Sequence, residues 1–223
     1  MSIHLLREVE RIKKHLLALS AMVEEALRKA AKAVTHKDET LARRVIEDDS
    51  EIDHMEVDIE EDCLKILALH QPVAVDLRFI VAILKINSDL ERIGDLAVNI
   101  AEQVLFLSAQ PMPMPANGYD FTAMASKAQV MLKQSLDSLI QLDTTLARNV
   151  CTADDEVDQQ YRAIFMTAKE QIKIHPDQTD VWLIILMIAR QLERIADHTT
   201  NIAEDVIYMI DGHIVRHQHE QTG

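Results

Sequence analysis

The chain has 223 residues, of which 48% are hydrophobic but only 4% aromatic, so aliphatic side chains and methionine must form its core. A formal net charge of −14 excludes a typical nucleic-acid partner, because phosphate backbones are bound by clustered Lys and Arg. With four glycines and five prolines, long segments contain no helix breaker, which favours an all-α fold.

The first half of the chain predicts three helices. The first carries apolar residues spaced three and four apart, as in a bundle helix, at Leu5, Val9, Ile12, Leu16, Leu19, Val23, Ala26, Ala30 and Val34. A turn at 35–38 leads to a second helix that runs to about His70. Pro72 marks a break, since proline disfavours helical geometry in the residue before it, and a third helix follows to about Leu107.

The second half predicts three more helices after a Pro-rich linker at 111–118. The fourth helix carries the same apolar spacing at Met124, Ala128, Met131, Ser135, Leu139, Leu142 and Leu146. Thr152 and Asp155 have the spacing of a capping box, which places the start of a fifth helix there. His175 and Pro176 form the turn into a sixth helix, and Gly212 ends it.

The two halves are copies of one unit. Residues 91–107 and 193–209 are identical at nine of seventeen aligned positions, including the motifs ERIGD and ERIAD. We therefore predict two tandem three-helix bundles, at 1–110 and 119–212, joined by the linker and followed by a tail at 213–223.

We expect neither a membrane-spanning helix nor a signal peptide in this sequence. Its longest apolar run, 181–189, is about half of the ~20 residues that a membrane helix needs. The first residues are too highly charged for a signal peptide. We expect a cytoplasmic protein that meets a membrane only through a partner.

Each repeat contains two acidic pairs with a spacing of four residues, which places both members of a pair on one helix face. The pairs are Asp49/Asp53 and Glu91/Asp95 in the first repeat, and Asp154/Asp158 and Glu193/Asp197 in the second. In a helix hairpin, residues equidistant from the turn lie level with each other. The midpoint of each set falls on a predicted turn, at Pro72 and at His175-Pro176, so the two pairs of each repeat should meet.

The same helix faces carry further oxygen ligands at the rim of the predicted core, which are Glu56, Asn99, Glu102, Asn201 and Glu204. Like charges this close repel, and either a metal ion or nearby arginines, for which Arg92 and Arg194 are the candidates, must offset the repulsion. Oxygen-only ligands select hard cations such as Mg²⁺, Ca²⁺, Mn²⁺ or ferric iron. Both interpretations remain open from the residues alone.

The repeated motifs ERIGD and ERIAD, each followed by NIAE, resemble the PhoU family of phosphate-signalling regulators. The segments LARRVIEDDSEIDHMEVDIEEDC and HQPVAVDLR are similar to the first repeat of that family, and the resemblance extends to about Gly212. It implies two similar three-helix bundles whose acidic motifs bind metal, as multinuclear iron or zinc clusters in some members. The eight paired carboxylates above are the positions that match.

The resemblance also implies a function. The family damps phosphate-regulon signalling between the phosphate ABC transporter, through its ATPase, and the sensor histidine kinase. We therefore expect a metal-binding negative regulator of phosphate uptake, an adaptor and a homodimer rather than an enzyme. The alternative is a metalloenzyme whose carboxylate cluster carries out redox or hydrolytic chemistry. Tyr161 and Phe165 stand where the first repeat has Glu56 and Glu60, so equal metal loading of the two repeats is in doubt.

Overall fold

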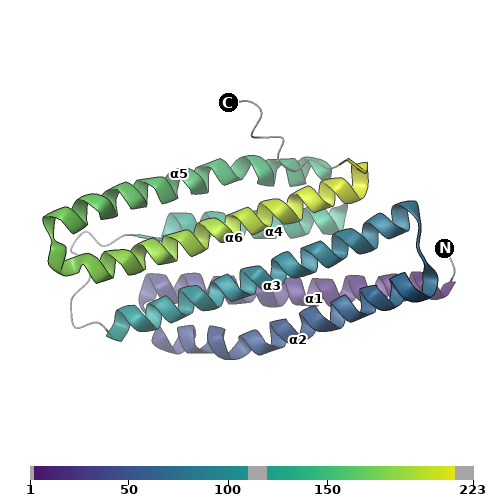
Figure 1. The fold of residues 1–223 in the computed structure, drawn as a ribbon, viewed down its shortest axis with the longest axis horizontal. Helices are drawn as coiled ribbons and strands as arrows, with labels where there is room; N and C mark the ends of the chain where they lie inside the picture. The colour runs from purple at the N-terminus through teal and green to yellow at the C-terminus, as the bar shows by residue number, and fades with distance from the viewer. Residues whose placement is uncertain (1–2, 110–119, 214–223) are drawn as a thin grey trace.

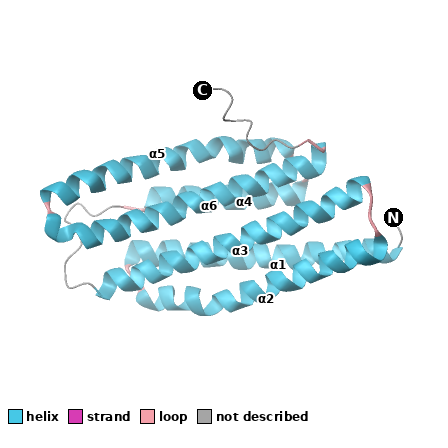
Figure 2. Ribbon diagram, in the orientation of Figure 1, coloured by secondary structure: helices cyan, strands magenta, loops and turns pink. Residues whose placement is uncertain are grey.

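A computed structural model describes residues 3–109 and 120–213, and in this part of the chain the regular structure is helical throughout (Figure 2). The helices are α1 (Ile3–His36), α2 (Glu39–His70), α3 (Ala74–Ala109), α4 (Thr122–Gln141), α5 (Thr144–Ile174) and α6 (Thr179–Asp211), with a short 3-10 helix at Pro176–Gln178. The predicted linker at 111–118 and the tail beyond His213 lie outside the described residues. The six predicted helices are confirmed.

The helices form two layers (Figure 1). In the front layer α2, α3, α6 and α5 lie side by side in that order, and α1 and α4 lie behind them. Within each repeat the three helices all contact one another. The repeats are joined by α3 against α6 in the front layer and by α1 against α4 behind, so α3 and α6 occupy the centre.

One continuous hydrophobic core serves both repeats. The stripe predicted for α1 is buried from Leu5 to Ala30, and Trp182 on α6 is the largest fully buried side chain. Because the core crosses from one repeat to the other, the two three-helix units pack as halves of a single structure. None of the helices in the described part of the chain is long and apolar enough to cross a membrane.

The boundary between the fourth and fifth helices differs from the prediction. α4 ends at Gln141, and α5 begins at Thr144 with Asp143 as its N-cap, so the capping box predicted at Thr152 is wrong. The Asp143 carboxylate accepts hydrogen bonds from the backbone N–H groups of Thr145 and Leu146. Thr152 lies inside α5, where its hydroxyl donates to the carbonyl of Arg148.

The contact between α3 and α6, which we call the seam, contains polar pairs. Lys85 Nζ lies 3.2 Å from Oδ1 of Asp205, and the same ammonium group lies over the ring of Tyr208. Nearby, Oδ1 of Asp89 is 2.7 Å from Nδ1 of His198. These pairs show that α3 and α6 run antiparallel, because a higher residue number on α3 meets a lower one on α6. The repeat relation places Met187 and Gln103 at the positions equivalent to Lys85 and Asp205.

The seam pair offers a test of how the repeats are held together. Asp205 is 1% exposed, so replacing Lys85 by Met, its counterpart in the other repeat, removes a cation from a buried carboxylate. We expect Lys85→Met to lower the free energy of unfolding by about 2 kcal/mol, measured by urea denaturation. The double variant Lys85→Met/Asp205→Gln copies Met187 and Gln103, and it should recover more than half of the loss. A double variant no more stable than the single one would contradict a stabilising pair.

Candidate functional site

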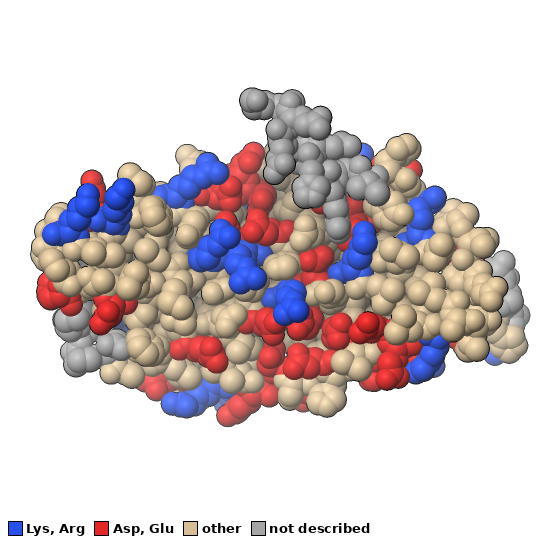
Figure 3. All heavy atoms as spheres, viewed as in Figure 1, with Lys and Arg blue, Asp and Glu red and all other residues tan. Residues whose placement is uncertain are grey.

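The acidic motifs lie on the front layer. On this face Asp and Glu side chains gather over the middle of α2, α3, α5 and α6, with Lys and Arg side chains among them (Figure 3). Two hairpins supply the predicted ligands, α2 with α3 and α5 with α6. We call the carboxylates of the first hairpin the first cluster and those of the second hairpin the second cluster.

The first cluster contains Asp49, Asp53 and Glu56 on α2, and Glu91 and Asp95 on α3. The two helices approach closely here at Gly94, where an added Cβ atom would lie 3.3 Å from Ile52 and 3.6 Å from Oδ1 of Asp49. A larger residue at this position would therefore push against the side chains of α2. Gly94 thus keeps Asp49 close to the backbone of α3.

Burial and the repulsion between like charges raise the pKa values of two carboxyl groups in the first cluster. Loss of solvent raises the pKa of Asp49 to about 6, and the negative charges of Asp53 and Asp95 add to the shift. The pKa of Glu91 is raised first by burial and then by Asp95. Because the charge of Asp95 on α3 raises the pKa of Asp49 on α2, the two acidic pairs lie close together, as predicted from their equal distances to the turn.

The second cluster contains Asp154 and Asp158 on α5, and Glu193 and Asp197 on α6. Burial raises the pKa of Asp154 to about 7, with further contributions from Asp197 and Asp158. The pKa of Glu193 is likewise raised by burial and by Asp197. Within the described structure, Oδ1 of Asp154 and Oε2 of Glu193 are buried oxygens without a hydrogen-bond partner. Such atoms carry an uncompensated desolvation cost.

Arginines provide part of the charge compensation. In the first cluster Arg92 lies 2.9 Å from Asp95 and 3.3 Å from Glu91, as one of the two interpretations predicted. In the second cluster the ion pairs come from Arg190 to Glu193 and from Arg162 to Asp158, whereas the predicted candidate Arg194 forms no ion pair among the described residues. Arg194 is exposed and acts on Asp197 only as a nearby charge. The i,i+4 spacing of Arg162 to Asp158 and the i,i+3 spacing of Arg190 to Glu193 mark both arginines as candidate partners in the sequence.

Only some of the further ligand candidates lie in the clusters. Glu56 belongs to the first cluster, because its charge raises the pKa of Glu91. Asn201 instead turns to the seam, where its amide donates to Asp89, and buried Glu204 lies near enough to Cys151 to raise the pKa of that thiol.

The two remaining candidates, Asn99 and Glu102, lie beyond Asp95 on α3, the first half-buried and the second exposed. At the counterpart of Glu56, the ring of Tyr161 lies under the guanidinium group of Arg190. The second cluster is therefore poorer in oxygen ligands than the first.

The clusters suit hard cations, because every donor is oxygen and like charges are already crowded there. Among the described side chains, however, no three carboxylate, imidazole or thiol groups converge in an arrangement ready to hold a metal ion. A cation bound at either cluster would have to displace the arginine ion pairs, in which the arginines are about half exposed or more.

Comparison with known proteins supplies the class. A family model described as the PhoU domain matches residues 16–104 and 121–206, once in each repeat. A "phosphate-specific transport system accessory protein PhoU homolog" from Aquifex aeolicus (strain VF5) is 40% identical over 215 residues, which are 96% of this chain and 96% of that protein.

Two crystal structures share the fold. PhoU from Pseudomonas aeruginosa has a TM-score of 0.89 and 37% identity, and the match covers 93% of this chain and 99% of that one. The "phosphate transport system regulatory protein PhoU" from Streptococcus pneumoniae has a TM-score of 0.81 and 30% identity, and the match covers 95% of this chain and 99% of that one.

The fold and these matches define an accessory protein built from two three-helix repeats, and not an enzyme, so the metalloenzyme alternative is set aside. The chain belongs to the PhoU family.

The raised pKa values predict a pH dependence of stability. A carboxyl group whose pKa rises on folding favours the folded state while it is protonated, and this stabilisation is lost as the pH rises from about 4 to the folded pKa. For Asp154 that limit is about 7. In a buffer with chelator, Asp154→Asn should therefore flatten the fall of the urea midpoint between pH 5 and pH 7.5. Asp180→Asn, a change at an exposed carboxylate in the first turn of α6, is the control, and equal slopes for both variants would contradict the assignment.

Proposed function

We propose that this protein is a metal-binding negative regulator of phosphate uptake and phosphate-regulon signalling. In this proposal it acts in the cytoplasm, as a homodimeric adaptor between the ATPase of a phosphate ABC transporter and its sensor histidine kinase. The observation that carries the regulatory role is the similarity over 96% of the chain to a protein described as a phosphate transport accessory protein. The full-length match to a protein described as regulatory agrees with this role.

The metal-binding part of the proposal is supported by the chemistry of the clusters. Asp49, Asp53, Glu91 and Asp95 would hold a cation in the first repeat, with Glu56 as an additional ligand. The like charges of their neighbours raise the pKa values of Asp49 and Glu91, and a cation would offset that repulsion. The cations that fit are iron, manganese, magnesium, calcium or zinc, bound singly or as a multinuclear group.

In the second repeat Asp154, Asp158, Glu193 and Asp197 would hold the cation. The buried oxygens of Asp154 and Glu193 that lack partners are the atoms that would gain most from it. A bound cation would join α5 to α6 as it would join α2 to α3. Metal would thus supply a cross-link at the surface of each hairpin, and no reaction step.

Metal binding can be tested by removing the arginine that competes for the second cluster. Arg190→Gln frees Glu193, and we expect the affinity for Mn²⁺, titrated calorimetrically into metal-free protein, to rise about tenfold. Arg148→Gln is the matched control, because Arg148 pairs with Asp211 outside the clusters and its removal changes the net charge equally. A rise of the same size in the Mn²⁺ affinity of both variants would show that the effect comes from the net charge alone.

Loss of a ligand tests the two repeats separately. Asp197→Asn should lower the metal content of the second cluster and leave the first loaded, and Asp95→Asn should do the reverse. Metal analysis of untagged protein measures both. A higher melting temperature with unchanged metal content would instead support clusters that are held by arginines alone.

The regulatory role has a genetic test. Deleting the gene should leave phosphate-responsive genes derepressed in high phosphate, measured by transcript levels and by intracellular phosphate. A chromosomal copy carrying Asp95→Asn and Asp197→Asn then separates metal binding from regulation. Unchanged expression and unchanged phosphate in the deletion strain would count against the assignment.

A further inference from the structure

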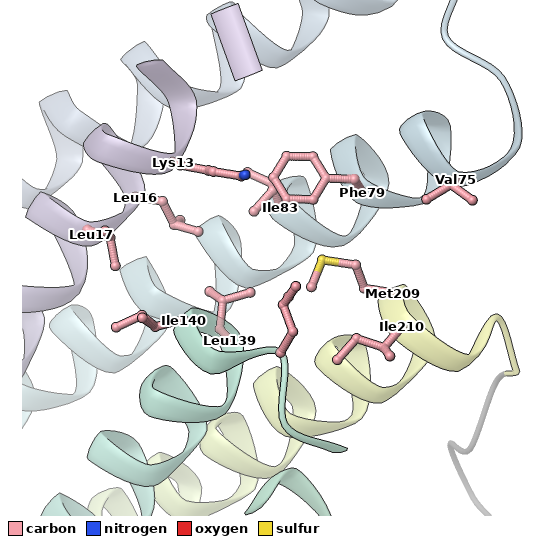
Figure 4. Close-up of a pocket in the computed structure, with 11 residues that line it drawn as sticks. Lys13, Leu16, Leu17, Val75, Phe79, Ile83, Leu139, Ile140, Met209 and Ile210 are labelled. Atoms are coloured by element: carbon pink, nitrogen blue, oxygen red, sulfur yellow. The ribbon is translucent and has the colours of Figure 1, made fainter. Parts of the chain in front are cut away.

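An apolar pocket opens where the two repeats meet, away from both carboxylate clusters. Four helices line it: α1 and α3 from the first repeat, and α4 and α6 from the second (Figure 4). Its volume is about 410 Å³, which is in the range of small-molecule sites. The surface near its mouth includes Leu17, Val75 and Ile140, which are exposed. A hollow lined by exposed aliphatic side chains is typical of a ligand or partner site.

One charged side chain lies among the described residues that line the pocket. This is Lys13, and its ammonium group lies 5.4 Å from the centre of the Phe79 ring. Lys13 also forms an ion pair of 2.9 Å with Glu10, in which both partners are exposed. Because such a pair contributes little stability, the anionic group of a ligand can take the place of Glu10.

The backbone conformation of Leu142 is a second, independent feature of the pocket. It caps α4 in the left-handed conformation, with φ 53° and ψ 43°, which is unusual for a bulky residue and is ordinarily met by glycine or asparagine. Its side chain is exposed and lines the pocket. The residue at the same point of the first repeat, between α1 and the N-cap Asp38, is Lys37, also with φ 53°. The second repeat thus places an exposed leucine in a strained position where the first has a lysine.

We propose that this pocket binds a single-chain amphiphile with one anionic head group. The alkyl chain lies among the leucine and isoleucine side chains, and the head group lies beside the ammonium group of Lys13. An aliphatic lining with one cation and few hydrogen-bond donors matches this ligand better than a polar metabolite. The proposal is independent of the proposed regulatory function and of metal binding.

Calorimetric titration of the full chain with decanoate, below its micelle concentration, tests the proposal. We expect saturable binding of one decanoate per chain, and weaker binding of uncharged decanol. Lys13→Met should weaken the binding of decanoate about threefold and leave the binding of decanol unchanged. Decyl phosphate is the second arm: tighter binding than decanoate assigns the head group to a phosphate ester, and weaker binding assigns a fatty acid. No saturable binding of either anion, or decanol binding as tightly as decanoate, would overturn the proposal.

Two asparagine variants locate the site. Leu142→Asn removes the apolar side chain but keeps a residue that tolerates the left-handed conformation, and it should weaken decanoate about tenfold. Lys37→Asn makes the same change at the equivalent cap of the first repeat and should leave binding unchanged. Equal affinities of the two variants would overturn the assignment to this pocket. Ile140→Asn, at another exposed lining position, repeats the test should Leu142→Asn fail to fold.

Discussion

The antiparallel packing of α3 against α6 is the contact on which the rest of the structure depends. It joins two hairpins into one front layer, merges two small cores into one and places the helices that carry both carboxylate clusters in the same layer. The seam is polar where Lys85 meets Asp205, yet the equivalent positions hold Met187 and Gln103. A shift of one helix turn would separate a buried carboxylate from its cation, so we infer that this pair also fixes the register of the repeats.

The carboxylates of both clusters lie at the edge of the hydrophobic core, where burial disfavours their charged form. Asp49 and Asp154 lie beside apolar side chains that the fold must bury, and the loss of solvent raises the pKa of each carboxyl group before any neighbour acts. Arg92 and Arg190 offset some of the repulsion, but both arginines are about half exposed and contribute little. Carboxylates kept together at such a cost are characteristic of functional sites, and this supports a cation role.

The sequence predicted most of this arrangement because its strongest signals are periodic. The stripe from Leu5 to Ala30 and the midpoints at Pro72 and His175 depend only on spacing, and each was confirmed. The boundary of α5 was wrong because Leu142 and Leu146 continue the spacing across a two-residue turn. The recurrence of TLAR, at Thr40 and again at Thr145, would have placed that boundary correctly. The arginine pairs could not be predicted in the same way, since long side chains choose among rotamers that no pattern of spacing determines.

The repeats have diverged in ways that separate local sites from shared ones. Each cluster is built within one hairpin, so it does not need the other repeat to exist. The pocket is different, because Lys13 and Phe79 come from one repeat, and Leu142 and Met209 from the other. Met209 directly follows Tyr208, whose ring lies under the seam lysine, so the pocket wall and the seam share a helix turn. A ligand bound there would stabilise the seam by mass action, whereas a cation in a cluster would stabilise a single hairpin.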